Sequence, residues 1–484
     1  MLITKSKFLI GLECPKCFWK VMHEKVTNEL SMQQEQFIKQ GIEIGNLAKK
    51  LFPNGLDLGN MSFEKNVEVT RDSLELNKVI FEAAIREDNL YARIDILVPN
   101  GDGFDIVEVK SSTKVKDNHI YDVAFQKYVC ERAGIIINKC YILHLNSAYI
   151  KEEELNLEEL FTKEDITTKV EEFYKNMPQL IEDLMDIYNL PEVPEINADK
   201  YLLKDYPCQF DSECWSFLPK NNVSKLYRLR KSKAAGLIRD NILEIAEVPD
   251  DFLSVNQLIQ KKAIVSDKTY INKEEIESFI SKLVYPLYYF DFETFMEAIP
   301  RFKGCNAYDQ IPFQYSLHVQ HEDSSLEHYE FLNREASDPR KSILISMIEV
   351  LGDKGSVIVY NQSFEKKRLE ELAELYPQYG PSINAILERV VDLLVPFSKF
   401  EYYNPSQQGS CSIKKVLPAV TGKSYDGMDI GNGGDASSIY FKATFEDEFT
   451  TNEKDKIYSD LLKYCGLDTE GMVWIVDELK KIIK

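Results

Sequence analysis

The chain has 484 residues, 44% hydrophobic and 28% charged, which suffices for two or three globular domains. A formal net charge of -21 argues against a protein that coats nucleic acid with its whole surface, but it is compatible with a protein that has one local basic groove. The first residues contain no apolar run long enough for a signal peptide or a membrane span, so we expect a cytoplasmic protein with no membrane partner.

Two pairs of cysteines bracket the first part of the chain. Cys14 and Cys17 lie near its start, and Cys208 and Cys214 lie near its end. The chain has nine cysteines, which in an intracellular protein favour thiols or metal ligands over disulfides. Two pairs of thiolates with no histidine inside either pair suit a 4Fe-4S cluster or a structural zinc ion.

Between these pairs, residues 90–112 predict two strands joined by a Pro-Asn-Gly-Asp-Gly turn. Asp95 lies on the polar face of the first strand, and Glu108 and Lys110 share one face of the second. Carboxylates on neighbouring strands can hold Mg2+ or Mn2+, and the lysine can orient water or stabilise phosphate charge. Two flanking helices offer Glu43 and Gln126 to the same site.

An aspartate followed by Glu-x-Lys resembles the core of the PD-(D/E)XK nucleases, and the following helix with Gln126 is similar to that of RecB-like members. With the bracketing cysteines, the region resembles the iron-sulfur RecB-like nucleases, in which a 4Fe-4S cluster joins both ends of the domain. Those relatives usually have one cysteine upstream and three downstream, whereas this chain has two and two. Zinc therefore stays open as the alternative.

A basic stretch follows the second cysteine pair. No acidic residue falls between Cys214 and Arg239, but seven basic residues do: Lys220, Lys225, Arg228, Arg230, Lys231, Lys233 and Arg239. In an acidic chain this local change of sign indicates either a nucleic-acid-binding surface or a solvated helix face beside a linker.

A second carboxylate motif begins at residue 287. The run 287–300 predicts a buried strand in which Asp291 and Glu293 point to the same side. Two neighbouring carboxylates on a packed sheet repel each other and resist desolvation, whereas Mg2+ or Mn2+ would remove that repulsion. Further carboxylates follow: Glu365 in the first turn of a predicted helix, and Asp468 on the same helix face as Tyr464.

Asp291-x-Glu293, Glu365 and Tyr464-xxx-Asp468 together resemble the DEDD exonucleases of the DnaQ-like, RNase H-fold superfamily, and the tyrosine makes the chain similar to the branch named for it. Glu365 stands where that pattern normally has an aspartate. The resemblance implies 3'-5' exonuclease activity, with the four carboxylates binding two metal ions and the tyrosine helping to orient the attacking water.

The sequence thus predicts an α/β protein in three parts: a PD-(D/E)XK restriction-endonuclease-like core (1–215), a helical basic connector (216–282) and an RNase H-like α/β domain (283–484). This order resembles a bacterial family that fuses a RecB-like nuclease to a DnaQ-like exonuclease. It implies a metal-dependent nuclease with two centres acting on nucleic acid, with DNA that has single-stranded ends favoured over RNA. The alternative is a nucleic-acid-binding or assembly protein in which one or both centres are inactive.

Overall fold

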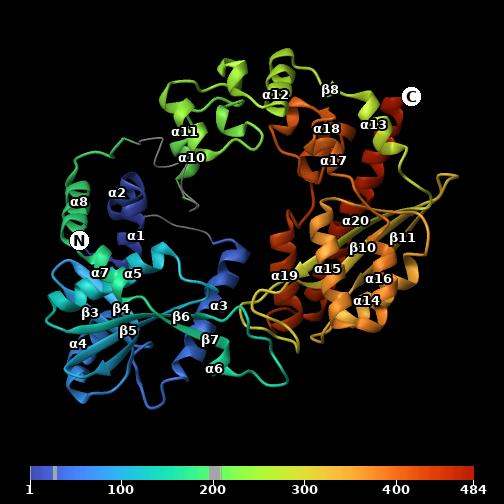
Figure 1. Ribbon diagram of the computed structural model, residues 1–484. Coiled ribbons are helices and arrows are strands. Elements are labelled where there is room, and N and C mark those ends of the chain that lie inside the picture. Colours follow the sequence, from blue (N-terminus) through green and yellow to red (C-terminus); the bar gives the residue numbers. More distant parts are fainter. Residues whose placement is uncertain (1, 25–29, 196–207, 209) are drawn as a thin grey trace. The chain divides into compact units, whose positions relative to one another are not determined.

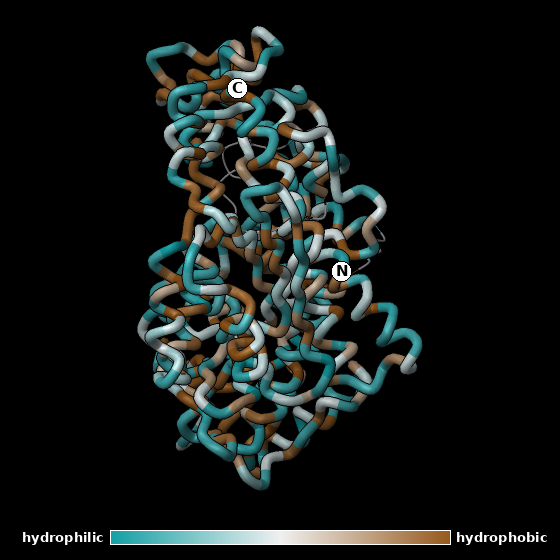
Figure 2. Tube along the Cα trace, turned by 90° about the vertical axis from the view of Figure 1, so that its right-hand side faces the viewer, coloured by the Kyte–Doolittle hydropathy of each residue, from teal (hydrophilic) through white to brown (hydrophobic). Residues whose placement is uncertain are grey.

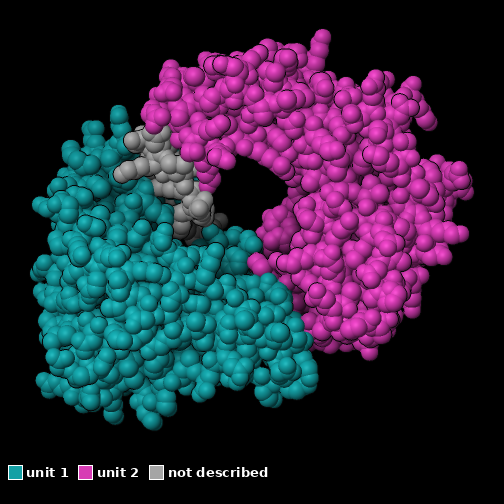
Figure 3. Space-filling view, in the orientation of Figure 1, with its two compact units in different colours: residues 1–216, 297–309 teal, residues 217–296, 310–484 magenta. Residues whose placement is uncertain are grey.

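The structure is a computed structural model that describes residues 2–24, 30–195, 208 and 210–484. The chain is a mixed α/β protein that divides into two compact units (Figure 3). Unit 1 contains residues 1–216 and 297–309, and unit 2 contains residues 217–296 and 310–484. Hydrophobic and hydrophilic residues alternate along the trace, as amphipathic helices and half-buried strands require (Figure 2).

Unit 1 combines a mixed sheet with helices (Figure 1). Its strands are β1 (Ile3–Thr4), β2 (Leu56–Asp57), β3 (Ile80–Glu87), β4 (Leu90–Asn100), β5 (Gly103–Lys110), β6 (Ile137–Leu145) and β7 (Phe161–Asp165). Its helices are α1 (Lys5–Glu13), α2 (Pro15–His23), α3 (Met32–Lys49), α4 (Phe63–Ser73), α5 (Asp117–Arg132), α6 (Leu157–Leu160), α7 (Thr167–Tyr174), α8 (Met177–Asn189) and α10 (Asp211–Cys214).

The sheet of unit 1 places the predicted strand pair at its centre. Its order is β2-β3-β4-β5-β6-β7, with β1 parallel to the start of β4. Strands β4 and β5 form the predicted hairpin, in which Asn100 faces Gly103 and Gly101 has a φ of 61°, a left-handed conformation that suits glycine. Helix α5 then connects β5 to the parallel strand β6, as a parallel connection requires.

The sheet of unit 1 is covered on both faces. Ile106 of β5 packs into one apolar core with Phe125 and Val129 of α5. The neighbouring Val107 packs on the opposite face with Ile44 of α3. Because side chains alternate along a strand, Glu108 shares the face of Ile106 and therefore points towards α5.

Unit 2 contains the connector and a second sheet. Its strands are β8 (Tyr270–Ile271), β9 (Leu287–Phe295), β10 (Ile311–Gln320), β11 (Leu326–Leu332), β12 (Ser356–Val359), β13 (Val390–Asp392) and β14 (Tyr402–Tyr403). Its helices are α11 (Lys231–Arg239), α12 (Val255–Ser266), α13 (Lys273–Ile280), α14 (Arg340–Val350), α15 (Gln362–Leu375), α16 (Gly380–Leu387), α17 (Val395–Ser398), α18 (Ile413–Thr421), α19 (Gly433–Phe445) and α20 (Thr451–Ile483).

Strand β9 lies in the middle of the larger sheet of unit 2, whose order is β11-β10-β9-β12-β13. It pairs antiparallel with β10 and parallel with β12. Phe290 and Phe292 pack into one core with α14 and α15, whereas Tyr289 packs into the other core with α18 and α20. The alternation therefore directs Asp291 and Glu293 towards α20.

The division into units differs from the predicted domains at two places. The predicted connector, residues 216–282, packs almost entirely within unit 2 rather than as a separate part. Residues 297–309, which the sequence placed in the last domain, pack with unit 1, where the backbone N–H of Ala298 donates to the side-chain oxygen of Gln40 over 3.1 Å. Among the helices of the described residues, none is long and apolar enough to cross a membrane.

Candidate functional site

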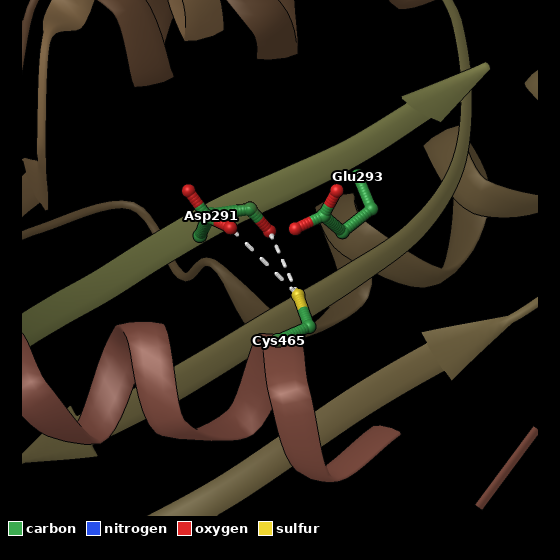
Figure 4. A group of neighbouring side chains, drawn as sticks. All are labelled: Asp291, Glu293 and Cys465. Carbon is green, nitrogen blue, oxygen red and sulfur yellow. Dashed lines mark hydrogen bonds between the residues drawn. The ribbon is translucent and has the colours of Figure 1, made fainter. Parts of the chain in front are cut away.

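The predicted carboxylate pair of unit 2 lies against the long helix α20 (Figure 4). Ligand atoms of Asp291, Glu293 and Cys465 all lie within 4.8 Å of one another. The Cys465 thiol donates to Oδ2 of Asp291 over 3.8 Å. Burial and the charge of Asp291 raise the pKa of Cys465 well above its ordinary value, so the sulfur stays a neutral thiol. We therefore regard the carboxylates, and not the sulfur, as the candidate metal ligands.

The other two predicted carboxylates, Glu365 and Asp468, both affect the pKa of Asp291. Burial, then Asp468, Glu293 and Glu365 in decreasing order, raise the pKa of Asp291 well above its ordinary value. Burial and Asp468 raise the pKa of Glu293 to about 8, and burial raises that of Glu365 to about 8. Asp468 itself has a pKa raised by burial to about 6. The structure thus brings the four predicted carboxylates into one electrostatically coupled group, which we name the unit 2 centre.

Three side chains from α18, α20 and the loop before α19 accompany this centre. The Tyr425 hydroxyl donates to Oδ1 of Asp468 over 2.5 Å, and a hydrogen bond with Tyr464 also lowers the pKa of Asp468. Lys414 Nζ lies 5.1 Å from the ring centroid of Tyr464 and 5.6 Å from that of Tyr425. Its charge lowers the pKa of Glu293 and Asp468, in opposition to burial.

The unit 2 centre fits a hard divalent cation. Glu365 is buried, and its Oε2 atom has no hydrogen-bond partner among the described residues. Asp392 accepts the backbone N–H groups of Asn361 and Leu394, each over 2.9 Å, and so fixes the turn that begins α15 and carries Glu365. Buried carboxylates with raised pKa values are relieved when a cation such as Mg2+ or Mn2+ joins them.

The second centre lies in unit 1, where Glu108 is the shared partner. Lys110 Nζ donates to Oε1 of Glu108 over 2.7 Å and to Oδ2 of Asp122 over 2.6 Å. Gln126 Nε2 donates to the other oxygen of each carboxylate, over 2.8 Å to Glu108 and 2.9 Å to Asp122. Lys5 Nζ donates to Oε1 of Glu108 over 2.8 Å. We name these residues, together with Asp95, the unit 1 centre.

The charges of the unit 1 centre give its carboxyl groups different pKa values, raised for Asp95 and lowered for Glu108. Burial and the charge of Glu108 raise the pKa of Asp95 to about 7, although Asp95 accepts the backbone N–H of Val109 over 2.9 Å. Burial alone would raise the pKa of Glu108, but Lys110 and Lys5 outweigh it and hold the value below its ordinary range. Paired carboxyl groups with divergent pKa values are typical of functional sites and of structural ion-pair networks.

Of the residues predicted for unit 1, the structure brings Asp95, Glu108, Lys110 and Gln126 together. Glu43 does not join them: its side chain is exposed on α3. Helix α3 packs through Ile44 and Ala48 on the sheet face opposite α5, so a side chain exposed on α3 is not directed to Glu108. The side-chain oxygen Oε1 of Gln126 is buried and has no hydrogen-bond partner among the described residues.

The four predicted cysteines form a group in unit 1. Cys14 ends α1 and caps α2, and its sulfur accepts the backbone N–H of Cys17 over 3.1 Å. Thiol hydrogen bonds with Cys14 and Cys208 raise the pKa of Cys17, whereas the bond from Cys17 lowers the pKa of Cys208 to about 7. Cys214 is buried and interacts electrostatically with Cys208 and Cys14. A cavity of about 230 Å³ is lined by three of these thiols together with Ser6, Leu9, Ile10, Glu13 and Asn118.

This arrangement fits a thiolate-bound metal group, because thiols from both ends of the unit converge on one cavity. Residues 196–207 and 209, which flank Cys208, lie outside the described residues.

The basic run of unit 2 is largely exposed: Arg228, Arg230, Lys231, Lys233 and Arg239 have exposed side chains on or beside α11. Lys225 is instead half-buried and bonds to Gln408 over 3.1 Å.

Five side chains in or beside the two centres were not predicted from the sequence. Two had a usable signal, because Asp122 precedes Gln126 by one helical turn and Cys465 precedes Asp468 by three residues on α20. The others come from segments far apart in the chain, and no spacing pattern could have identified them: Lys5, Lys414 and Tyr425.

Comparisons with known proteins place the chain among relatives without an assigned activity. A family model described as "Domain of unknown function (DUF2779)" matches residues 288–412, which include Asp291, Glu293 and Glu365. An uncharacterized protein of Mycoplasma genitalium (MG366) is 25% identical over 77% of this chain, which spans 64% of that protein's length. An uncharacterized protein of Ureaplasma parvum (UU173) is 21% identical, with 98% of this chain and 87% of that protein covered. The crystal structure of SSO0001 is 14% identical over 44% of this chain and 98% of its own, with a TM-score of 0.17.

Proposed function

We propose that the chain is a metal-dependent nuclease with two phosphodiester-hydrolysing centres. The observation that carries this proposal is the convergence of four carboxyl groups from β9, α15 and α20, of which Glu293, Glu365 and Asp468 are buried and together raise the pKa of Asp291. Folding places these groups together against their mutual repulsion, and an oxygen-binding divalent cation accounts for that arrangement.

In the unit 2 centre, bound Mg2+ or Mn2+ would polarise the phosphate and supply an activated water. The candidate ligands are Asp291, Glu293, Glu365 and Asp468. Tyr464, whose hydroxyl lies beside Asp468, is the candidate for orienting the attacking water. The charge of Lys414 is placed to balance negative charge that the substrate phosphate brings to the site. A central strand with antiparallel neighbours on one side and parallel ones on the other is compatible with an RNase H-like domain.

In the unit 1 centre, Asp95 and Glu108 are the candidate ligands, and Lys110 is the candidate for stabilising phosphate charge. Gln126 and Asp122 position Lys110 and Glu108. The hairpin β4-β5 followed by the crossover helix α5 is compatible with a PD-(D/E)XK core. The four cysteines would hold a 4Fe-4S cluster, or zinc, as a structural group that joins the two ends of the unit.

We infer DNA with single-stranded ends as the preferred substrate, with RNA as the variant to be tested. The exposed basic residues of and around α11 support a nucleic-acid partner, since they can neutralise backbone phosphates on an otherwise acidic chain. Phosphate contacts are common to DNA and RNA, so the assay compares the two substrates.

The test is degradation of end-labelled single-stranded DNA, double-stranded DNA and RNA by the purified chain, with Mn2+, Mg2+ or EDTA. We expect cleavage that needs the metal and proceeds from ends. Lys110→Met should remove the cleavage that survives in Asp291→Asn/Glu293→Gln, whereas the control Lys114→Met, an exposed residue in the loop after β5, should not. Metal-dependent binding of the same strands without cleavage would instead favour the binding or assembly function.

A further inference from the structure

Lys5 is a second ammonium group in the unit 1 centre. It is the first residue of α1, and its Nζ atom lies 2.8 Å from Oε1 of Glu108 and 3.7 Å from Oδ2 of Asp122. The charge of Asp95 also acts on it. Lys5 therefore interacts with the three carboxylates of the centre at once.

The hydrogen bonds of Glu108 leave little access for a metal ion. Its Oε2 atom accepts from Gln126, and its Oε1 atom accepts from both Lys110 and Lys5. A carboxylate oxygen has two lone pairs, so Oε1 can bind a cation only if Lys110 or Lys5 leaves it. A cation on Oε2 would lie beside both ammonium groups, whose charge repels it.

Of the two lysines, Lys5 is held less firmly. Lys110 is bonded to Glu108 and to Asp122 within 2.7 Å, and it stands two residues from Glu108 on the same strand. Lys5 has one bond of that kind, comes from a separate helix and has the slightly more exposed side chain, 27% against 21%. Lys5 is therefore the group that can withdraw without disturbing the strand.

Building on the proposed nuclease function, we propose that Lys5 is the resident counter-ion of the unit 1 centre and that a divalent cation must displace it in order to bind Asp95 and Glu108. Three carboxylates and two ammonium groups, all ionised, would give the centre a net charge of -1. Replacing Lys5 by a neutral side chain would make it -2, the charge that one divalent cation balances. Lys5 is thus a positioning residue that sets the metal affinity of the centre.

The test is Mn2+ binding to the full chain in an Asp291→Asn/Glu293→Gln background, so that the unit 2 centre does not contribute. Free Mn2+ is followed by electron paramagnetic resonance after removal of metal with EDTA. We expect Lys5→Met to lower the Kd for Mn2+ by at least about tenfold, since a single charge a few ångströms from a divalent ion has a large effect at a partly buried site. Lys5→Gln should act in the same direction and serves if Lys5→Met does not fold.

Two controls accompany these variants. Lys5→Arg keeps the charge and should bind Mn2+ like the background protein. Lys7→Met removes a lysine of the same helix that donates to the backbone oxygen of Leu2, and it should also leave the Kd unchanged. Adding Asp95→Asn to Lys5→Met should abolish the tight binding, which assigns it to this centre.

An unchanged or higher Kd in Lys5→Met and Lys5→Gln, together with Mn2+ binding that Asp95→Asn weakens, would overturn the role of Lys5 and leave the metal centre intact. The absence of any Asp95-dependent binding in all variants would overturn both the role of Lys5 and the proposed unit 1 centre. Tighter binding in Lys5→Met without cleavage by any variant would support the role of Lys5 and count against nuclease activity in unit 1.

Discussion

The hydroxyl of Tyr425 donates a hydrogen bond of 2.5 Å to Oδ1 of Asp468, a residue 43 positions later in the chain. Tyr425 belongs to the loop between α18 and α19, whereas Asp468 lies in the middle of α20. The bond favours the ionised form of a carboxyl group whose pKa burial raises to about 6. Tyr425 thereby helps to keep a candidate metal ligand ionised near neutral pH.

Tyr425→Phe should shift the acid limb of the pH-rate profile of the unit 2 centre to higher pH. Without the hydrogen bond, the pKa of Asp468 rises, so the carboxylate needed for metal binding is lost at a higher pH as the solution is acidified. We expect a shift of about half to one pH unit. The measurement is kcat/KM for single-stranded DNA between pH 5 and 9. Tyr402→Phe, whose hydroxyl donates to the backbone oxygen of Ala419, should keep the parent profile; an unshifted Tyr425→Phe profile would contradict this role.

The stability of the metal-free protein should fall as pH rises from about 5 to 8.5. The pKa values of Glu293 and Glu365 in the folded chain are each about 8, above their ordinary value of 4.5. The folded state therefore binds more protons than the unfolded state between those values, and its stability decreases with pH in that window. Each unit by which a pKa is raised in the folded chain contributes at most about 1.4 kcal/mol to the free energy of unfolding.

We expect the Tm of the unit 2 transition to drop by about 5 °C or more across this pH window in EDTA. Asp291→Asn/Glu293→Gln should flatten the dependence, and saturating Mn2+ should reverse it. Glu470→Gln, a half-buried carboxyl on the same helix as Asp468, is the matched control. A Tm that rises with pH in EDTA would show that these groups are not held with raised pKa values.

The sequence predicted the elements that carry the carboxylates, because those elements have strong local signals. Alternation along β9 placed Asp291 and Glu293 on one face, and the turn at Gly101 defined the hairpin β4-β5. Other side chains of the two centres come together only through the tertiary fold, and residue spacing in the sequence does not indicate them. Lys414 reaches the unit 2 centre from α18, and Lys5 reaches the unit 1 centre from α1, through contacts that depend on tertiary packing alone. The prediction that Glu43 belongs to the unit 1 centre was wrong, because the periodicity of α3 identifies a helix but not the sheet face that the helix covers.

The cysteine group should be structural rather than catalytic. A metal group that joins Cys14 and Cys17 to Cys208 and Cys214 closes a loop of nearly the whole unit, so its binding energy adds to folding energy. Anaerobically purified protein should be brown and contain iron and sulfide. Cys208→Ser should lose the colour, lower the Tm of unit 1 and weaken its cleavage, while the activity of unit 2 persists.

Cys411→Ser is the control for this experiment, since Cys411 lies in unit 2 and donates to the backbone oxygen of Phe397. Colourless protein with stoichiometric zinc would retain the cysteine group but replace the iron-sulfur assignment. Finding neither metal, with Cys208→Ser as stable as the parent, would rule out a metal group at these thiols.

The exposed basic residues around α11 should bind the phosphate backbone. Lys231→Glu/Lys233→Glu reverses two exposed charges of this helix. We expect about tenfold weaker binding of single-stranded DNA at low salt. The slope of log K against the logarithm of the salt concentration should become shallower by roughly 1.4, the contribution of two phosphate contacts. Lys268→Glu/Lys273→Glu, also exposed in unit 2 but outside the basic run, is the control. Equal losses in both variants would indicate a general charge effect.

The proposed nuclease activity of unit 2 requires that the carboxylates of β9 form a catalytic metal centre. Its most direct test is Mn2+-dependent degradation of 5'-labelled single-stranded DNA in a Lys110→Met background, where the unit 2 centre acts alone. Asp291→Asn/Glu293→Gln should lower kcat by at least about 100-fold, because removing ligands of a catalytic metal removes its stabilisation of the developing charge, whereas Glu470→Gln should retain parent activity. Undiminished degradation by Asp291→Asn/Glu293→Gln, with the metal requirement intact, would contradict the claim.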